Sequence, residues 1–166
     1  MHTMKNNSGF TLVEVLVVVI IISILVSLAV ISGRGQIGKA RVEQGVRQLY
    51  ADLLSARMGA MNRGRFQFLV VNAALQRYEI WEDTDPAPFG DEQQTAADTR
   101  LVQTTMNDLI TVVTGTATVT FDTRGLVSPI GTLRIGDGGF NPRVDCITIS
   151  TTRIRLGRYV GGACVS

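Results

Sequence analysis

The feature that most limits how this chain can fold is a long apolar run without a charged residue, from Val15 to Ser32. As a helix, these 18 residues would span roughly 27 Å, which is close to the thickness of a hydrocarbon core. A buried strand needs only about 4 to 8 apolar residues. A soluble core helix would show a polar stripe, for which only Ser23 and Ser27 are available. The run therefore predicts a membrane-spanning helix.

Length and charge predict one compact domain beside this helix. A chain of 166 residues suits a single domain with an appendage. The net charge of +2 is too small to indicate binding of nucleic acid or membrane by bulk electrostatics. The charge is unevenly spread, with seven acids and no base from Glu79 to Asp98, and six arginines against two acids from Arg124 to Arg158. A charged partner would therefore have to bind a local cluster.

The residue inventory argues against common catalytic and metal sites. His2 is the only histidine, and Cys146 and Cys164 are the only cysteines, so neither a His/Cys metal cluster nor a histidine-based triad can be assembled. We expect no metal, no cofactor and no enzymatic activity. In an oxidising compartment the two cysteines could form a disulfide that stabilises the fold by roughly 3 kcal/mol. In a reducing cytosol they would be two unrelated small apolar residues.

A short polar leader, "MHTMKNNSG", precedes the apolar run. A secretory signal has its cleavage site after the apolar region, whereas cleavage after Gly9 would leave the apolar segment in place as an anchor. The stretch "GFTLVE", residues 9–14, resembles the processing site of type IV pilins and type II secretion pseudopilins. This resemblance implies that a prepilin peptidase cleaves after Gly9 and N-methylates Phe10.

Glu14 lies near the start of the apolar run. An ionised carboxylate in a membrane helix costs about 2.5 to 3.5 kcal/mol, so it is usually retained for a role and has a partner. The resemblance implies that the partner is the amino terminus of a neighbouring subunit, here Phe10, and that the ion pair sets the axial register in a helical filament. The alternative is that Glu14 lies at the membrane interface and is solvated.

The stretch "GRGQIG", residues 33–38, matches the glycine pattern of dinucleotide-binding sites, and Asp52 follows at about the expected distance. That site needs a short strand before the glycines and an acid at the end of a second strand. Here the preceding run is too long, and Asp52 lies in a helical pattern. We therefore reject an oxidoreductase.

Glycine is a poor helix former, so we expect Gly33, Gly35, Gly38 and Gly45 to soften the helix, with local unwinding.

The helix is expected to continue to about Asn62 and to stop at Arg63-Gly64. Its apolar face comprises Val42, Val46, Leu49, Leu53, Ala56 and Ala60. Short β-rich runs follow: "RFQFLVV", "QRYEIWE", "LITVV", "ATVTFDT", "GTLRIG", "RVDCITIS" and "TRIRLGRYV". The segment "DTDPAPFGDEQQTAADT" is expected to form a long exposed loop.

These patterns predict an α+β chain, in which a long N-terminal transmembrane and assembly helix packs on a C-terminal antiparallel β domain. The expected divisions are a leader at 1–9, a membrane helix at 10–32, an amphipathic continuation at 33–62 and a β-rich globular domain at 63–166.

A narrower resemblance comes from "LYADLLSARMGAMNRGR", "FDTRGLVSP" and a terminal Ile/Arg strand near a cysteine, which together are similar to GspH/FimT-type minor pseudopilins. It implies a structural subunit of a type II secretion pseudopilus or a type IV pilus, acting in filament assembly and protein export. The implied partners are other pilin or pseudopilin subunits, the prepilin peptidase and the bacterial inner membrane. The implied location is a single pass with the C-terminal domain in the periplasm.

Lys and Arg are denser after the apolar run than before it, which opposes this orientation. We give more weight to the leader, because the peptidase implied by the resemblance acts at the cytoplasmic face.

Arg153 and Arg155 are two positions apart in a predicted strand and should share one face. Some DNA-uptake relatives carry Gly-Arg-x-Arg here, whereas this chain has Thr152 in place of the glycine. Arg158 and Arg143 are candidates to extend the patch through phosphate contacts. The alternative function is therefore double-stranded DNA binding for natural transformation, and the simpler interpretation is a solvated strand face.

Overall fold

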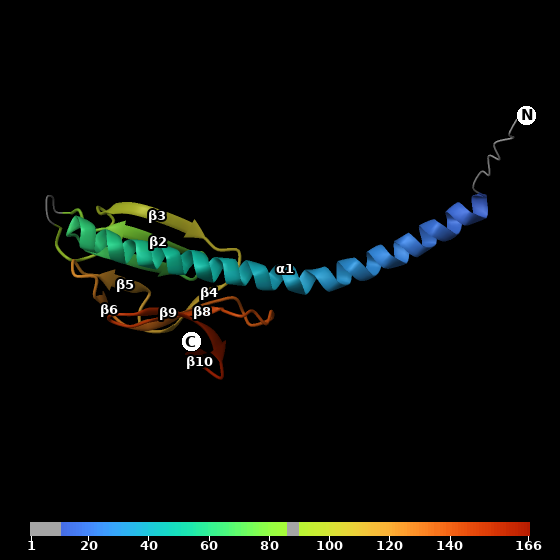
Figure 1. The fold of residues 1–166 in the computed structure, drawn as a ribbon. Coiled ribbons are helices and arrows are strands. Elements are labelled where there is room, and N and C mark those ends of the chain that lie inside the picture. The colour runs from blue at the N-terminus through green and yellow to red at the C-terminus, as the bar shows by residue number, and fades with distance from the viewer. Residues whose placement is uncertain (1–10, 86–89) are drawn as a thin grey trace, which may run out of the picture. The chain divides into compact units, whose positions relative to one another are not determined.

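The structure, a computed structural model, describes residues 11–85 and 90–166, and between 28 and 34 it describes the backbone alone. The predicted leader, with Gly9, and Phe10 lie outside the described residues. The chain divides into two units, 1–37 and 38–166, which are treated separately. Helix α1, Leu12–Arg63, contributes to both (Figure 1).

The first unit contains the N-terminal part of α1. Its described large apolar side chains, at positions 12, 13, 15–22, 24–26 and 37, are all exposed. The hydroxyl of Ser23 donates to the carbonyl of Val19 at 2.7 Å, and that of Ser27 to the carbonyl of Ser23 at 2.8 Å. The hydroxyls of both serines are therefore satisfied within the helix itself.

Among the described residues, no helix combines the length and the apolarity that a membrane crossing requires. The predicted membrane segment, 10–32, includes Phe10 and the side chains of 28–32, which lie outside what the structure describes.

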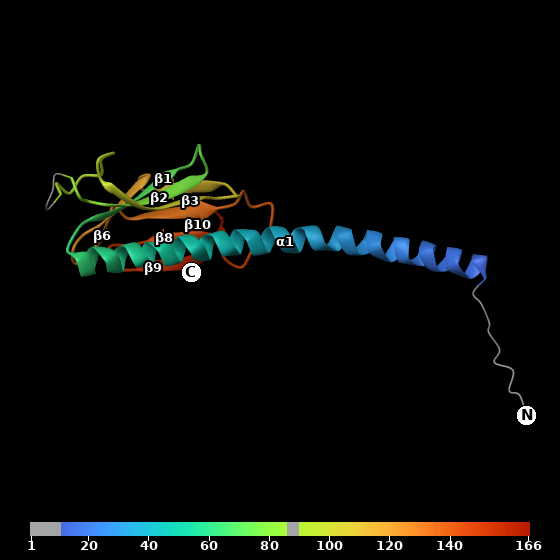
Figure 2. The same cartoon turned by 90° about the horizontal axis from the view of Figure 1, so that it is seen from above.

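The second unit contains the rest of α1 and two antiparallel sheets (Figure 2). One sheet has the order β3-β2-β1-β5-β6 and the other the order β10-β9-β8-β7-β4. The strands are β1 Gln67–Asn72, β2 Arg77–Glu82, β3 Thr99–Thr105, β4 Ile110–Thr114, β5 Thr118–Phe121, β6 Val127–Ser128, β7 Gly131–Ile135, β8 Cys146–Ile149, β9 Ile154–Val160 and β10 Ala163–Val165. The predicted arrangement of a helix packed on an antiparallel β domain is confirmed.

The core lies between α1 and both sheets. The predicted apolar face of the helix is confirmed, because all six of its residues are buried: Val42, Val46, Leu49, Leu53, Ala56 and Ala60. They form one cluster with side chains of both sheets, including Leu69 and Tyr78 of the first sheet and Leu133 and Ile147 of the second. Burial of this face, rather than helix propensity alone, fixes the C-terminal half of α1.

The predicted helix stop is also confirmed, one residue later than expected. Gly64 adopts a φ of 64°, and the N–H of Arg65 donates to the carbonyl of Ala60 at 3.3 Å. This is the geometry of a Schellman cap, in which a glycine turns the chain out of the helix.

The expected softening at the helix glycines is not observed, since α1 is continuous through all of them. Gly38 and Gly45 instead receive side chains from the β domain. A Cβ on Gly38 would approach the ring of Phe140 to 2.4 Å, and one on Gly45 would approach Met106 to 2.9 Å. Seven residues make about two helical turns, so both glycines lie on one face. Their absent side chains allow close packing of the helix on its domain.

The predicted exposed loop between β2 and β3 is only partly correct, because two of its carboxylates are buried. Asp83 accepts the N–H groups of Asp91 and Glu92 at 3.2 and 2.7 Å. Asp98 accepts those of Thr84, Asp85 and Thr95 at 3.0, 3.2 and 2.7 Å. In this segment, backbone N–H groups that strand pairing would satisfy in a sheet donate to these two carboxylates instead.

Candidate functional site

Glu14 lies in the first turn of α1. Its N–H donates to the hydroxyl of Thr11 at 3.2 Å, so Thr11 caps the helix. Within the described residues, the Glu14 carboxylate has no hydrogen-bond or ion-pair partner. The positive end of the helix dipole favours a negative charge at this position. The Glu14 side chain is exposed in the structure.

The predicted disulfide between Cys146 and Cys164 is confirmed. Cys146 lies in β8 and Cys164 in β10, with β9 between them, and their Cα atoms are 6.0 Å apart. Gly157 of β9 pairs with Cys146 and lies against Cys164, so the bridge passes over a strand position that has no side chain. The bridge ties the short C-terminal strand to the sheet.

The structure places the four candidate arginines in two different settings. Arg153 and Arg155 are exposed on either side of the buried Ile154, as strand alternation predicts. Arg158 has the opposite parity in β9 and donates to the side chain of Asn141. Arg143 lies in the loop before β8, where its N–H donates to Glu43 of α1 at 2.7 Å. Arg153 and Arg155 thus share one face of the strand. Arg158, at an alternate position, points to the other face.

In the described part of the chain these four arginines have no carboxylate partner, which is also true of Arg41, Arg47 and Arg57 of α1. The ion pairs there are Arg63–Glu82, Arg77–Glu79, Arg100–Glu79, Arg124–Asp122 and Arg134–Asp145. The cations on and beside β9 are therefore not neutralised within their own subunit.

Sequence reasoning missed a further arginine at this end of the domain. Arg57 of α1 donates to the carbonyl of Thr152 at 2.9 Å, next to Arg153. The two residues are 95 positions apart, so no local pattern could have joined them. Arg57 holds the β8–β9 turn against the helix.

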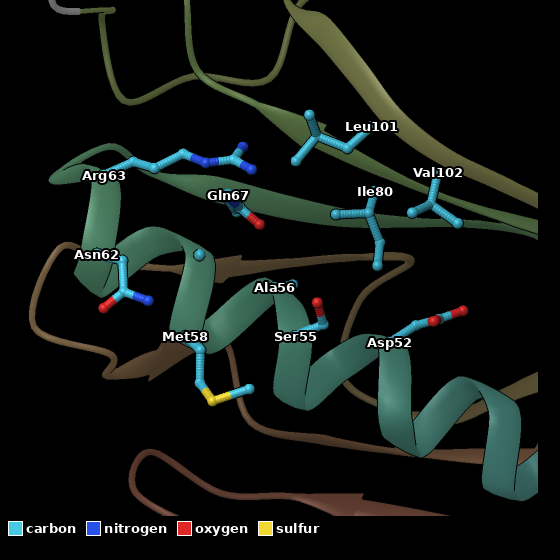
Figure 3. Close-up of a pocket in the computed structure, with 11 residues that line it drawn as sticks. Asp52, Ser55, Ala56, Met58, Asn62, Arg63, Gln67, Ile80, Leu101 and Val102 are labelled. Carbon is cyan, nitrogen blue, oxygen red and sulfur yellow. The ribbon is translucent and has the colours of Figure 1, made fainter.

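A pocket of about 490 Å³ lies between α1 and strands β2 and β3 (Figure 3). It is lined by Asp52, Ser55, Ala56, Met58, Gly59, Asn62, Arg63, Gln67, Ile80, Leu101 and Val102. Asp52 accepts the hydroxyl of Tyr78 at 2.6 Å and the amide of Gln48 at 3.1 Å. Burial raises the pKa of Tyr78, and the hydrogen bond to Asp52 raises it further by a smaller amount. Asp52 therefore has a structural role on the helix and does not follow a strand, as a ribose-binding acid would.

The pocket lining has no histidine or cysteine. In the part of the chain that the structure describes, no group of three or more His, Cys, Asp or Glu side chains could hold a metal ion. The pocket therefore offers a mixed polar and apolar surface rather than a recognisable arrangement of reacting groups.

Comparison with protein families assigns the two parts of the chain separately. Residues 4–30 match the prokaryotic N-terminal methylation motif. Residues 45–153, more than half of the chain, match the family described as type II transport protein GspH. This chain belongs to the GspH family. The family match covers most of the helix-and-sheet unit described above and ends at Arg153, just before β9 begins.

Solved structures agree with this assignment at the level of the fold. Two structures of the minor pseudopilin EpsH from the type II secretion system of Vibrio cholerae are similar to this GspH-family chain, each with a TM-score of 0.53. One is 18% identical, with 70% of this chain and 95% of EpsH covered. The other is 17% identical, with 72% and 97% covered. No curated protein sequence matches the chain.

Proposed function

We propose that this GspH-family chain is a minor pseudopilin subunit of a type II secretion pseudopilus or a type IV pilus, with a structural role in filament assembly and protein export. The observation that carries the proposal is the order of the two family matches, with the methylation motif at 4–30 followed by the GspH region at 45–153. A filament subunit requires an N-terminal anchoring segment, exposed by removal of a leader, and a folded globular domain after it.

The exposed apolar surface of the first unit supports an anchoring role. Large apolar side chains at positions 15–22 are all about half exposed, from 47% to 56%. Such a surface needs lipid or other helices to cover it. Ser23 and Ser27 bond to backbone carbonyls of their own helix, so they add no unsatisfied polar group to an apolar environment. In this proposal, residues 10–32 anchor the subunit in the bacterial inner membrane before it enters the filament.

The disulfide supports a periplasmic position for the β domain, because disulfides persist in oxidising compartments such as the periplasm. The prepilin peptidase would then cut after Gly9 on the cytoplasmic side and methylate Phe10.

Glu14 is proposed to bind the amino terminus of Phe10 in a neighbouring subunit. Its carboxylate has no partner within the described chain, and a buried carboxylate gains most from a partner of opposite charge. The ion pair would hold one axial register as the helix leaves the lipid.

The test is expression of Glu14→Gln and Glu14→Ala in a strain that builds the filament, with leader cleavage and co-purification with filament subunits as readouts. Both variants should be cleaved and neither should be incorporated. Glu92→Gln, at an exposed carboxylate of the β domain, is the control and should be incorporated normally. Normal incorporation of Glu14→Ala would remove the role assigned to this residue.

Double-stranded DNA binding for natural transformation is the second candidate function. It is favoured by one observation, which is that Arg143, Arg153, Arg155 and Arg158 have no carboxylate partner in the described part of the chain. The double variant Arg153→Gln/Arg155→Gln should weaken duplex binding in a gel shift and flatten its salt dependence, because each phosphate contact releases counterions. A shift that is unaffected by the pair of substitutions would exclude this candidate.

A further inference from the structure

Strand β9, Ile154–Val160, pairs with a different neighbour along each half of its length. Its first half pairs with β8, from Ile154 opposite Ile149 to Gly157 opposite Cys146. On the other side, β10 covers only the second half, from Arg158 to Val160. Within the described residues, the first half of β9 therefore has no strand paired to it on the side of β10 and presents an open edge there.

The backbone groups on this open edge can be identified from the ladder. The N–H of Ser150 donates to the carbonyl of Arg153 at 2.8 Å, which closes the β8–β9 turn. In an antiparallel ladder the peptide groups of successive residues point to alternate sides. Those of Arg153 and Arg155 thus face β8, and those of Ile154 and Leu156 face the open edge. Among the described residues, no backbone hydrogen bond pairs this edge.

A groove of about 390 Å³ runs beside this edge. It is lined by Tyr50 of α1, by Ile154, Arg155 and Leu156 of β9, and by Ser166. Tyr50 and Leu156 are half-buried and pack against the core, so they give the groove an apolar side that is held in place by the core. Arg155 contributes a cation without a carboxylate partner, and Arg153 lies two residues away on the same face.

We propose that the open edge of β9 binds an extended acidic segment of another protein subunit by strand addition. The segment would pair its backbone with the N–H and C=O groups of Ile154 and Leu156. Acidic side chains at alternate positions of the segment would face Arg153 and Arg155, since side chains two apart in a strand share a face. The inference rests on the proposed function in one respect, which is that the segment belongs to a neighbouring subunit of the filament.

An acidic peptide fits this surface better than a nucleic acid does. Phosphate contacts require only cations, and they would leave the peptide groups of the edge unpaired. A peptide strand satisfies the cations and the backbone together, and unpaired strand edges are common sites for pairing with another chain. The open edge is short, so we expect weak binding that adds to contacts elsewhere in a filament.

The test uses the full-length protein in detergent micelles and a fluorescein-labelled peptide, Val-Glu-Val-Glu-Val-Glu-Val. Two matched peptides separate the contributions, one with Gln in place of Glu and one with N-methylated backbone at alternate positions. Binding is followed by fluorescence polarisation, and amide hydrogen exchange is followed by NMR.

The proposal predicts binding of the Glu peptide, with slower exchange at the amides of Ile154 and Leu156 and no change at the amide of Arg155, which already faces β8. Arg153→Gln and Arg155→Gln should each weaken binding about threefold, the size of a cross-strand charge pair. Arg143→Gln is the control and should bind as the unchanged protein does. The Gln and N-methylated peptides should both bind more weakly.

Unchanged exchange at Ile154 and Leu156, or equal affinity for the N-methylated peptide, would overturn the proposal. Binding of a DNA duplex without binding of the peptide would also overturn it, in favour of the DNA-binding candidate. The peptide titration does not depend on leader cleavage, so a failure of the filament role would be seen separately, in the processing and incorporation of Glu14 variants.

Discussion

Gly157 lies against the sulfur of Cys164, with no room for a side chain between them. A Cβ on Gly157 would be 2.8 Å from that Sγ and 2.6 Å from the carbonyl oxygen of Val165. The variant Gly157→Ala should therefore displace β10 and slow closure of the Cys146–Cys164 bridge. We expect maleimide labelling to detect more free thiol after oxidative refolding of Gly157→Ala than of the unchanged protein.

The control for this prediction is Gly35→Ala, because a Cβ at Gly35 meets no atom within 4 Å. It should form the disulfide as the unchanged protein does. Complete and equally fast oxidation of Gly157→Ala would show that β10 adjusts without cost.

The disulfide itself should stabilise the β domain. It closes a loop with a sequence separation of 18 residues, for which the loop-entropy model gives about 3 kcal/mol. The double variant Cys146→Ser/Cys164→Ser should lose about this amount in urea unfolding followed by Trp81 fluorescence. Adding a reductant to the unchanged protein should produce the same loss and leave the double variant unaffected. Equal stabilities with and without reductant would mean that β10 contributes little to the fold.

Gly59 allows α1 to pack closely on a buried amide. A Cβ there would lie 2.5 Å from Nε2 of Gln67, which is 1% exposed and donates to Glu82 at 3.3 Å. Although Ala favours a helix by about 1 kcal/mol over Gly, overpacking and a displaced buried amide cost more. We expect Gly59→Ala to lower the free energy of unfolding by about 1 to 3 kcal/mol.

The same substitution at Gly35 separates helix propensity from packing. Gly35→Ala should leave the unfolding midpoint unchanged or raise it, since its Cβ would meet nothing. If Gly59→Ala also raised the midpoint, the close approach to Gln67 would not constrain the fold.

Asp98 should make the β2–β3 segment sensitive to acid. Burial alone would raise the pKa of this carboxyl, but the N–H groups of Thr95, Thr84 and Asp85 outweigh burial and lower it. A lowered folded-state pKa stabilises the fold above the unfolded pKa of about 3.9, and this stabilisation disappears as the pH falls through the folded value. Asp98→Asn should therefore destabilise by about 1 to 3 kcal/mol at pH 7 and by little below the folded pKa.

Asp83 is the matched control for this pH dependence. It also accepts two N–H groups, but burial dominates and raises its pKa. A raised carboxyl pKa means that ionisation opposes folding, so Asp83→Asn should cost less at pH 7 than Asp98→Asn. Unfolding curves of both variants at pH 3 and pH 7 would check the difference, and a larger loss for Asp83→Asn would contradict it.

The sequence predicted the parts of the fold that carry a strong local pattern. The helix face from Val42 to Ala60 repeats every three or four residues, and strands such as β1 and β2 are rich in apolar and aromatic residues. Strand β3 was missed because it is a mostly exposed edge strand in which only Leu101 and Val102 are apolar. Strand β10 was missed because it is three residues long and follows two glycines.

The same limit applies to the candidate site. Strand alternation predicted a shared face for Arg153 and Arg155, but it gave no information on which edge of β9 would be paired. That depends on the register with β10 and on the position of Tyr50 on α1, which are long-range features of the fold. The contact between Arg57 and Thr152 was likewise beyond any sequence pattern.

The central claim is that this chain is a processed and anchored filament subunit, and mass spectrometry of the N-terminus from a bacterial membrane fraction tests it most directly. Our account predicts a chain that has lost residues 1–9 and begins at an N-methylated Phe10. A chain in the same fraction that still carries residues of the leader before Phe10 would contradict it.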